Sequence, residues 1–141
     1  MKKLFFIAAL IVTGSVAAQD ITTDFAMAVK AGDMDQAKSF ITEESVNECH
    51  DLTRKQVSMM VFILSTGNDE LLKYAVEEKN ADVNIQCGKY TPLSWAAKNG
   101  SAETVAYLLQ QGADKSIATK GKTAMDWAQY YKRNEIIAML D

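Results

Sequence analysis

The chain has 141 residues, a formal net charge of −3, one histidine and two cysteines. Its length suits a single domain. An acidic total argues against nucleic acids and anionic lipids as partners, because both would repel the protein.

Residues 1–18 have the pattern of a secretory signal peptide: paired lysines, a short apolar run and small residues before a cleavage site after Ala18. The apolar run, residues 4–12, is shorter than the roughly 20 residues of a membrane span, so a cleaved leader is favoured over an anchor. Gln19 follows the cleavage site, and without a cysteine there a lipid-modified N-terminus is not expected. We therefore expect a bacterial periplasmic protein, with secretion as the alternative, and a mature domain of residues 19–141 that does not insert into membranes.

The clearest helix of the mature chain lies in TPLSWAAKNG, residues 91–100. Thr91 offers a hydroxyl to the free N–H groups of the first turn, and Pro92 suits the next position because it lacks an N–H. Gly100 permits the left-handed conformation that ends a helix. Small alanines on one face let another backbone approach, so this two-turn helix needs a neighbour to be stable.

The same pattern recurs along the chain. Thr123 begins TAMDWA, 32 residues after Thr91, and Gly67 precedes Gly100 by 33 residues. The segments ELLKYAVEEKNADVN and ETVAYLLQQGADKS are matching second helices that end in related turns. A period near 33 residues is the signature of a repeat architecture.

These motifs resemble an ankyrin repeat, most fully over residues 82–115. The resemblance rests on Thr91-Pro92-Leu93-Ser94-Trp95-Ala96-Ala97, followed by Gly100, Val105, Leu108-Leu109 and Gly112-Ala113-Asp114. It implies an all-α fold, a solenoid of about four stacked helix-turn-helix units with short finger loops. The approximate units are residues 20–48, 49–81, 82–115 and 116–141. Ser94 departs from the family pattern, which has histidine at that position.

A stack of such units buries one shared core, since no unit covers its own apolar face. The core is expected to include Phe25, Phe40, Ile41, Phe62, Leu71, Leu72, Trp95, Leu108, Trp127 and Ile136.

The two cysteines fall in neighbouring fingers when the repeats are aligned. Val46-Asn47 then parallels Val83-Asn84, which places Cys49 and Cys87 two and three residues beyond matching points. Adjacent repeats stack closely and an exported protein meets an oxidising compartment. A structural disulfide is therefore favoured over two free thiols or a redox switch.

The sequence predicts no enzyme. His50 is flanked by Cys49 and Asp51, but neighbours on a loop seldom converge into a catalytic or zinc site. Phosphate-binding loops, nucleophile elbows and paired-carboxylate patterns are missing. We expect no catalytic residue, metal or cofactor, and we place His50 on a surface loop.

The resemblance implies a non-catalytic module that binds another protein along its concave side, through finger tips and the first helix of each repeat. The matching positions are Arg54, Lys55, Ser65 and Thr66, then Lys89, Tyr90, Ser94, Lys98 and Asn99, and finally Lys120, Lys122, Tyr130 and Tyr131. The basic residues predict a partner with an acidic patch, and tyrosine is favoured at interface hot spots. The tyrosine pair has two interpretations, contact with a partner or closure of the end of the stack.

Export joined to a binding scaffold favours a monomer that inhibits, or protects against, one envelope enzyme, such as a cell-wall hydrolase or a delivered toxin. Exported bacterial ankyrin-repeat proteins resemble companions of catalase-type enzymes, so an accessory role in oxidative-stress defence is an alternative. A redox-active or metal-binding protein that uses Cys49, His50 and Cys87 is another alternative, and so is a secreted protein aimed at a host target.

Overall fold

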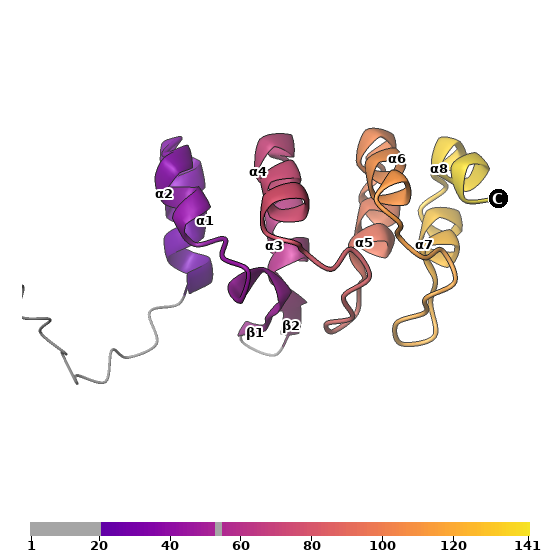
Figure 1. The fold of residues 1–141 in the computed structure, drawn as a ribbon. Coiled ribbons are helices and arrows are strands. Elements are labelled where there is room, and N and C mark those ends of the chain that lie inside the picture. The colour runs from indigo at the N-terminus through magenta and orange to yellow at the C-terminus, as the bar shows by residue number, and fades with distance from the viewer. Residues whose placement is uncertain (1–20, 53–54) are drawn as a thin grey trace, which may run out of the picture.

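The computed structural model describes residues 21–52 and 55–141, which form four helix pairs stacked side by side (Figure 1). The pairs are α1 (Ile21–Ala31) with α2 (Met34–Ser39), α3 (Met59–Ser65) with α4 (Asp69–Lys73), α5 (Pro92–Asn99) with α6 (Ala102–Gln110), and α7 (Ala124–Tyr130) with α8 (Asn134–Leu140). A 3-10 turn, Ser45–Asn47, follows α2, and a π-helical turn, Tyr74–Glu78, extends α4. The predicted solenoid of stacked pairs is confirmed, while the predicted leader lies outside the described residues.

Finger loops project from the same edge of the stack after each of the first three pairs (Figure 1). The first finger is an antiparallel hairpin of β1 (Cys49–Leu52) and β2 (Lys55–Ser58), which was not expected from the sequence. The second finger is residues 82–90 and the third is residues 114–122. Each has a single antiparallel bridge, Cys87 with Tyr90 and Thr119 with Lys122. No helix in the described ranges has the length and apolar character needed to cross a membrane.

Reciprocal capping starts the first helices of the third and fourth pairs. Thr91 Oγ1 accepts a hydrogen bond from the Ser94 N–H at 3.1 Å, and Ser94 Oγ accepts one from the Thr91 N–H at 2.8 Å. The Asp126 carboxylate accepts the Thr123 N–H in the same way at 2.8 Å, and this bond lowers the pKa of Asp126. Gly100 ends α5 in the left-handed conformation, as predicted.

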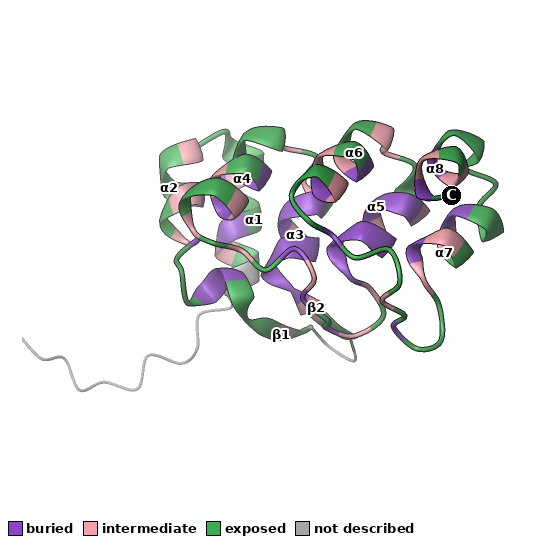
Figure 2. Cartoon of the chain, turned by 45° about the vertical axis from the view of Figure 1, so that its right-hand side comes forward, coloured by how far each residue is buried: buried purple, intermediate pink, exposed green. Residues whose placement is uncertain are grey.

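The shared core runs through the middle of the stack, and α3 and α5 show it most fully (Figure 2). Six of the predicted core residues are buried, namely Phe25, Ile41, Leu71, Leu72, Leu108 and Ile136. Phe40, Phe62, Trp95 and Trp127 are only half-buried. Phe62 packs on Phe25 with 5.5 Å between ring centroids, so it belongs to the edge of the core.

Two asparagines join neighbouring units at equivalent places. Asn47 Oδ1 accepts a hydrogen bond from the Asp82 N–H at 2.7 Å, and Asn84 Oδ1 accepts one from the Asp114 N–H at 2.7 Å. Their amide groups also donate, to the carbonyls of Asn80 and Gly112 respectively. Each side chain therefore satisfies backbone groups in the turn that follows the next helix pair.

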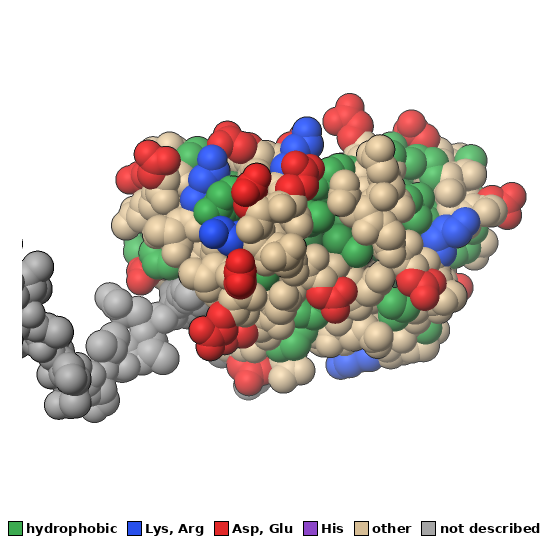
Figure 3. Space-filling view, viewed as in Figure 1, with side chains coloured by type: hydrophobic (Ala, Val, Ile, Leu, Met, Phe, Trp, Pro, Cys, Tyr) green, Lys and Arg blue, Asp and Glu red, His purple; other side chains and the backbone are tan. Residues whose placement is uncertain are grey.

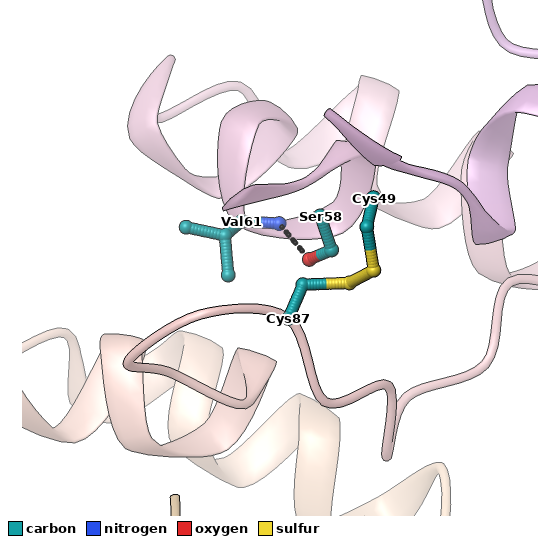
Figure 4. Close-up of a disulfide and its surroundings, with 4 residues drawn as sticks. All are labelled: Cys49, Ser58, Val61 and Cys87. Carbon is teal, nitrogen blue, oxygen red and sulfur yellow. Dashed lines mark hydrogen bonds between the residues drawn. A yellow bond between two sulfur atoms is a disulfide. The ribbon is translucent and has the colours of Figure 1, made fainter. Parts of the chain in front are cut away.

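A disulfide joins Cys49 of the first finger to Cys87 of the second, with Cα atoms 5.7 Å apart (Figure 4). The predicted bridge is thus present. Beside it, Ser58 Oγ caps α3 by accepting the Val61 N–H at 3.1 Å. Gly88 follows the bridge with φ of +64°, and any side chain there would collide with the Gln56 carbonyl oxygen. The hairpin therefore lies directly against the second finger.

Removing the bridge should lower the free energy of unfolding by about 4 kcal/mol, because it closes a 38-residue loop and restricts the unfolded chain. Urea unfolding of the oxidised protein and of the Cys49→Ser/Cys87→Ser variant measures this difference. A reducing agent should weaken the wild type to the level of the variant and leave the variant unchanged. A difference below about 1 kcal/mol would contradict the expectation.

Candidate protein-interaction surface

Six side chains of the third and fourth units form a continuous group, which we call the aromatic–lysine cluster. Its members are Tyr90, Lys98, Lys122, Trp127, Tyr130 and Tyr131. The last three aromatic residues share one face of α7 and its end, since residues three and four apart are neighbours on a helix. The Trp127 ring is central: its centroid lies 5.2 Å from that of Tyr90 and 6.2 Å from that of Tyr131.

The two lysines of the cluster lie against its rings. Lys98 Nζ is 4.9 Å from the Tyr90 centroid and 5.9 Å from the Trp127 ring, and it donates a hydrogen bond to the Tyr90 hydroxyl at 2.9 Å. Lys122 Nζ lies 5.4 Å from the Trp127 ring and 5.6 Å from that of Tyr130. Cation–π contacts contribute about 0.5–1 kcal/mol each at exposed sites. They restrict the rings and place two positive charges beside them.

Exposure differs strongly within the cluster. Tyr130 is 70% exposed and Tyr131 40%, whereas Trp127 is half-buried. Tyr131 stacks on Trp127 with 19° between ring planes, while Tyr130 meets Tyr131 edge to face. Within the predicted pair, Tyr131 therefore packs on Trp127, while Tyr130 is the more open to solvent. Trp127 was predicted as a core residue, although its spacing of three and four residues to the two tyrosines indicates a shared helix face.

A hollow of about 530 Å³ lies between the fingers and adjoins the cluster at Tyr90. We call it the finger cavity; its lining residues are Asp51, Lys55, Gln56, Val57, Gly88, Lys89, Tyr90 and Lys120. Four of the predicted contact residues therefore surround one space, namely Lys55, Lys89, Tyr90 and Lys120. Thr119 Oγ1 donates to the Lys89 carbonyl at 2.6 Å and links the third finger to the second.

Ser94 is the predicted contact residue that the structure contradicts. Its side chain is 0% exposed, and its hydroxyl is held in the capping box with Thr91. Its hydrogen bonds with Thr91 and the packing of neighbouring helices bury Ser94, so its side chain is not open to a partner.

The remaining predicted contacts lie at helix ends or outside the description. Ser65 and Thr66 donate their hydroxyls to backbone carbonyls of α3 at 2.6 Å, and the Asn99 amide donates to the Trp95 carbonyl at 2.8 Å. These three bonds help to end α3 and α5. Arg54 lies outside the described residues.

His50 lies on β1 opposite Val57 and is half-buried, so its prediction as a surface loop residue was wrong. The hairpin pairing places it on a strand. Its Nε2 atom is buried without a hydrogen-bond partner among the described residues. The neighbouring Cys49 is held in the disulfide and is neither a nucleophile nor a ligand. Within residues 21–52 and 55–141, no three His, Cys, Asp or Glu side chains group as a metal site requires.

The second helices of the pairs carry a different surface. Acidic side chains are spread along the face shown in Figure 3. Lys38 of α2 forms an ion pair with Glu70 of α4, and this hydrogen bond raises the pKa of Lys38. The Tyr107 hydroxyl on α6 donates to Glu77 Oε1 at 3.0 Å. Burial, followed by this bond, raises the pKa of Tyr107 to about 12.

Comparison with known proteins identifies the repeats. A family model described as "Ankyrin repeats (3 copies)" matches residues 25–119 and residues 60–140. "Palmitoyltransferase AKR1" of Lachancea kluyveri is 31% identical over 100 residues, which is 69% of this chain and 13% of that protein. "Ankyrin repeat and SAM domain-containing protein 6" of Rattus norvegicus is 34% identical over 106 residues, 73% of this chain and 12% of that protein. This chain therefore matches a small part of either eukaryotic relative, and its predicted bacterial, exported type stays a prediction.

Tyr107 should titrate with a midpoint near pH 12. Because its folded-state pKa is raised, its contribution to stability is full below the unfolded pKa of about 10 and is lost as pH rises towards 12. Tyrosinate absorbance during an alkaline titration measures the midpoint. Tyr107→Phe should remove the phase near pH 12 and Tyr130→Phe should keep it; a folded wild type without a phase near pH 12 would contradict the assignment.

Proposed function

We propose that this chain, which belongs to the ankyrin-repeat family, binds one protein partner through the aromatic–lysine cluster and the adjoining finger cavity. The family is generally non-catalytic, and its repeats imply protein–protein interaction. The observation that carries the proposal is the cluster itself, in which Tyr130 is 70% exposed beside rings that two lysines restrain.

Such a cluster suits a binding hot spot for a physical reason. Aromatic side chains bury a large area with few rotatable bonds, so their ordering on binding costs little. Here the rings already contact one another: Tyr130 lies 5.0 Å from Tyr131, which in turn stacks on Trp127. Less of the binding free energy is therefore lost in fixing these side chains when the partner binds.

The charge of the partner surface is proposed to be negative. Lys98 and Lys122 lie in the cluster, while acidic side chains are spread over the second helices (Figure 3). A basic surface on a protein of net charge −3 orients an approaching acidic patch and raises its association rate.

We further propose that the protein acts in a bacterial periplasm, where it inhibits an envelope enzyme or protects the cell against one. The leader-like pattern of residues 1–18 supports export, and the Cys49–Cys87 disulfide suits an oxidising compartment.

Capture on the immobilised, oxidised protein tests this role. From a periplasmic extract we expect one stoichiometric enzyme whose activity falls when the protein is added. Recovery of a catalase-type enzyme with unchanged activity would favour the accessory role in oxidative-stress defence, and recovery of no partner would contradict the proposal.

The Tyr130→Ala/Tyr131→Ala variant should lose about 2 kcal/mol or more of affinity for the captured partner, roughly thirtyfold in Kd, with little change in melting temperature. Isothermal titration calorimetry and thermal unfolding measure the two quantities. Met27→Ala is the matched control, because Met27 is a 58% exposed hydrophobic residue on α1 at the other end of the stack. A large fall in melting temperature with unchanged affinity would assign the tyrosines to closing the stack instead.

A further inference from the structure

We propose that the finger cavity is a distinct site for an acidic peptide segment, which its three lysines hold through carboxylate groups. The inference rests on the proposed function in one respect only, that the natural ligand is part of a protein. It adds a second place of acidic recognition, in the cavity, to the two lysines of the cluster, Lys98 and Lys122.

The charge of the cavity is the first argument. Among the described residues, its lining contains three lysines, Lys55, Lys89 and Lys120, and one acidic side chain, Asp51. The ion pair found in the described residues joins Lys38 to Glu70 and uses none of these lysines. Their ammonium groups are thus available to a ligand, in a protein whose formal net charge is −3.

The construction of the walls is the second argument. Each lysine comes from a different finger, and the fingers are joined to one another. The Cys49–Cys87 disulfide and the close approach of Gly88 to Gln56 hold the first finger against the second. The Thr119–Lys89 hydrogen bond holds the third. A ligand therefore meets lysines whose backbones are already in place, which lowers the ordering cost of binding.

Size and lining select the ligand class. A volume of about 530 Å³ is in the range of pockets for drug-sized ligands and is large for a single phosphate group. Val57 and the Tyr90 ring add apolar wall between the charges. Because a single exposed lysine–carboxylate contact is weak, useful affinity requires several carboxylates on one ligand. An extended segment rich in Asp and Glu meets all three conditions.

The test uses the oxidised full chain and a blocked peptide, acetyl-Asp-Glu-Asp-Glu-amide, with acetyl-Asn-Gln-Asn-Gln-amide as the neutral probe. Amide chemical shifts of Gly88, Tyr90 and Lys120 report binding at the cavity. We expect saturable shifts with the acidic peptide that weaken as salt is added, and none with the neutral peptide.

Two variants of equal net charge separate the cavity from the overall charge. Lys55→Gln/Lys89→Gln/Lys120→Gln should weaken peptide binding roughly tenfold. Lys30→Gln/Lys73→Gln/Lys132→Gln removes the same charge elsewhere and should change the dissociation constant by less than about twofold. Equal weakening by both variants, or absence of saturable shifts in the wild type, would overturn the assignment.

Inorganic phosphate is titrated in the same way, as an alternative ligand. If it shifts the same signals at least as tightly as the acidic peptide, the cavity is a phosphate site and the assignment to an acidic segment is wrong. The Tyr130→Ala/Tyr131→Ala variant should bind the peptide as the wild type does. If this variant binds both the peptide and the protein partner as the wild type does, the cavity is upheld as the acidic site. The proposal that the aromatic–lysine cluster binds the partner is then wrong.

Discussion

The distance between neighbouring units is the constraint on which the other features depend. Asn47 and Asn84 each span it with a pair of hydrogen bonds to the turn that follows the next helix pair. With this spacing, finger residues far apart in sequence become neighbours. Cys49 and Cys87 come within bridging distance, and Tyr90 of one unit reaches Trp127 of the next.

Local chemistry explains what could be predicted. Thr91, Pro92 and Gly100 begin and end a helix through their own backbone preferences, so their roles follow from the sequence alone. The fold followed from the recurrence of this pattern. The disulfide followed too, because aligning the repeats already places its cysteines in adjacent fingers.

The wrong predictions have a common physical origin: the contacts of a side chain are decided only when the repeats stack. Ser94 occupies a position suited to contact with a partner, yet its hydroxyl completes a cap and neighbouring helices cover it. Trp127 has the size of a core residue, but its packing partners are Tyr90 and Tyr131 at the edge of the stack. The finger cavity was not predicted, because its shape depends on how the disulfide and the Thr119–Lys89 hydrogen bond hold the fingers together.

The Cys49–Cys87 disulfide also changes how the chain responds to mechanical force. In the oxidised molecule, tension applied at the two ends passes through the sulfur atoms and bypasses the segment between Cys49 and Cys87, whose sequence separation is 38. Fully extended, that stretch would span about 130 Å at roughly 3.4 Å per residue. The oxidised chain unfolded by force is therefore shorter than the reduced chain by about this length. The α3–α4 pair lies inside this closed ring and is shielded from tension until the bridge is broken.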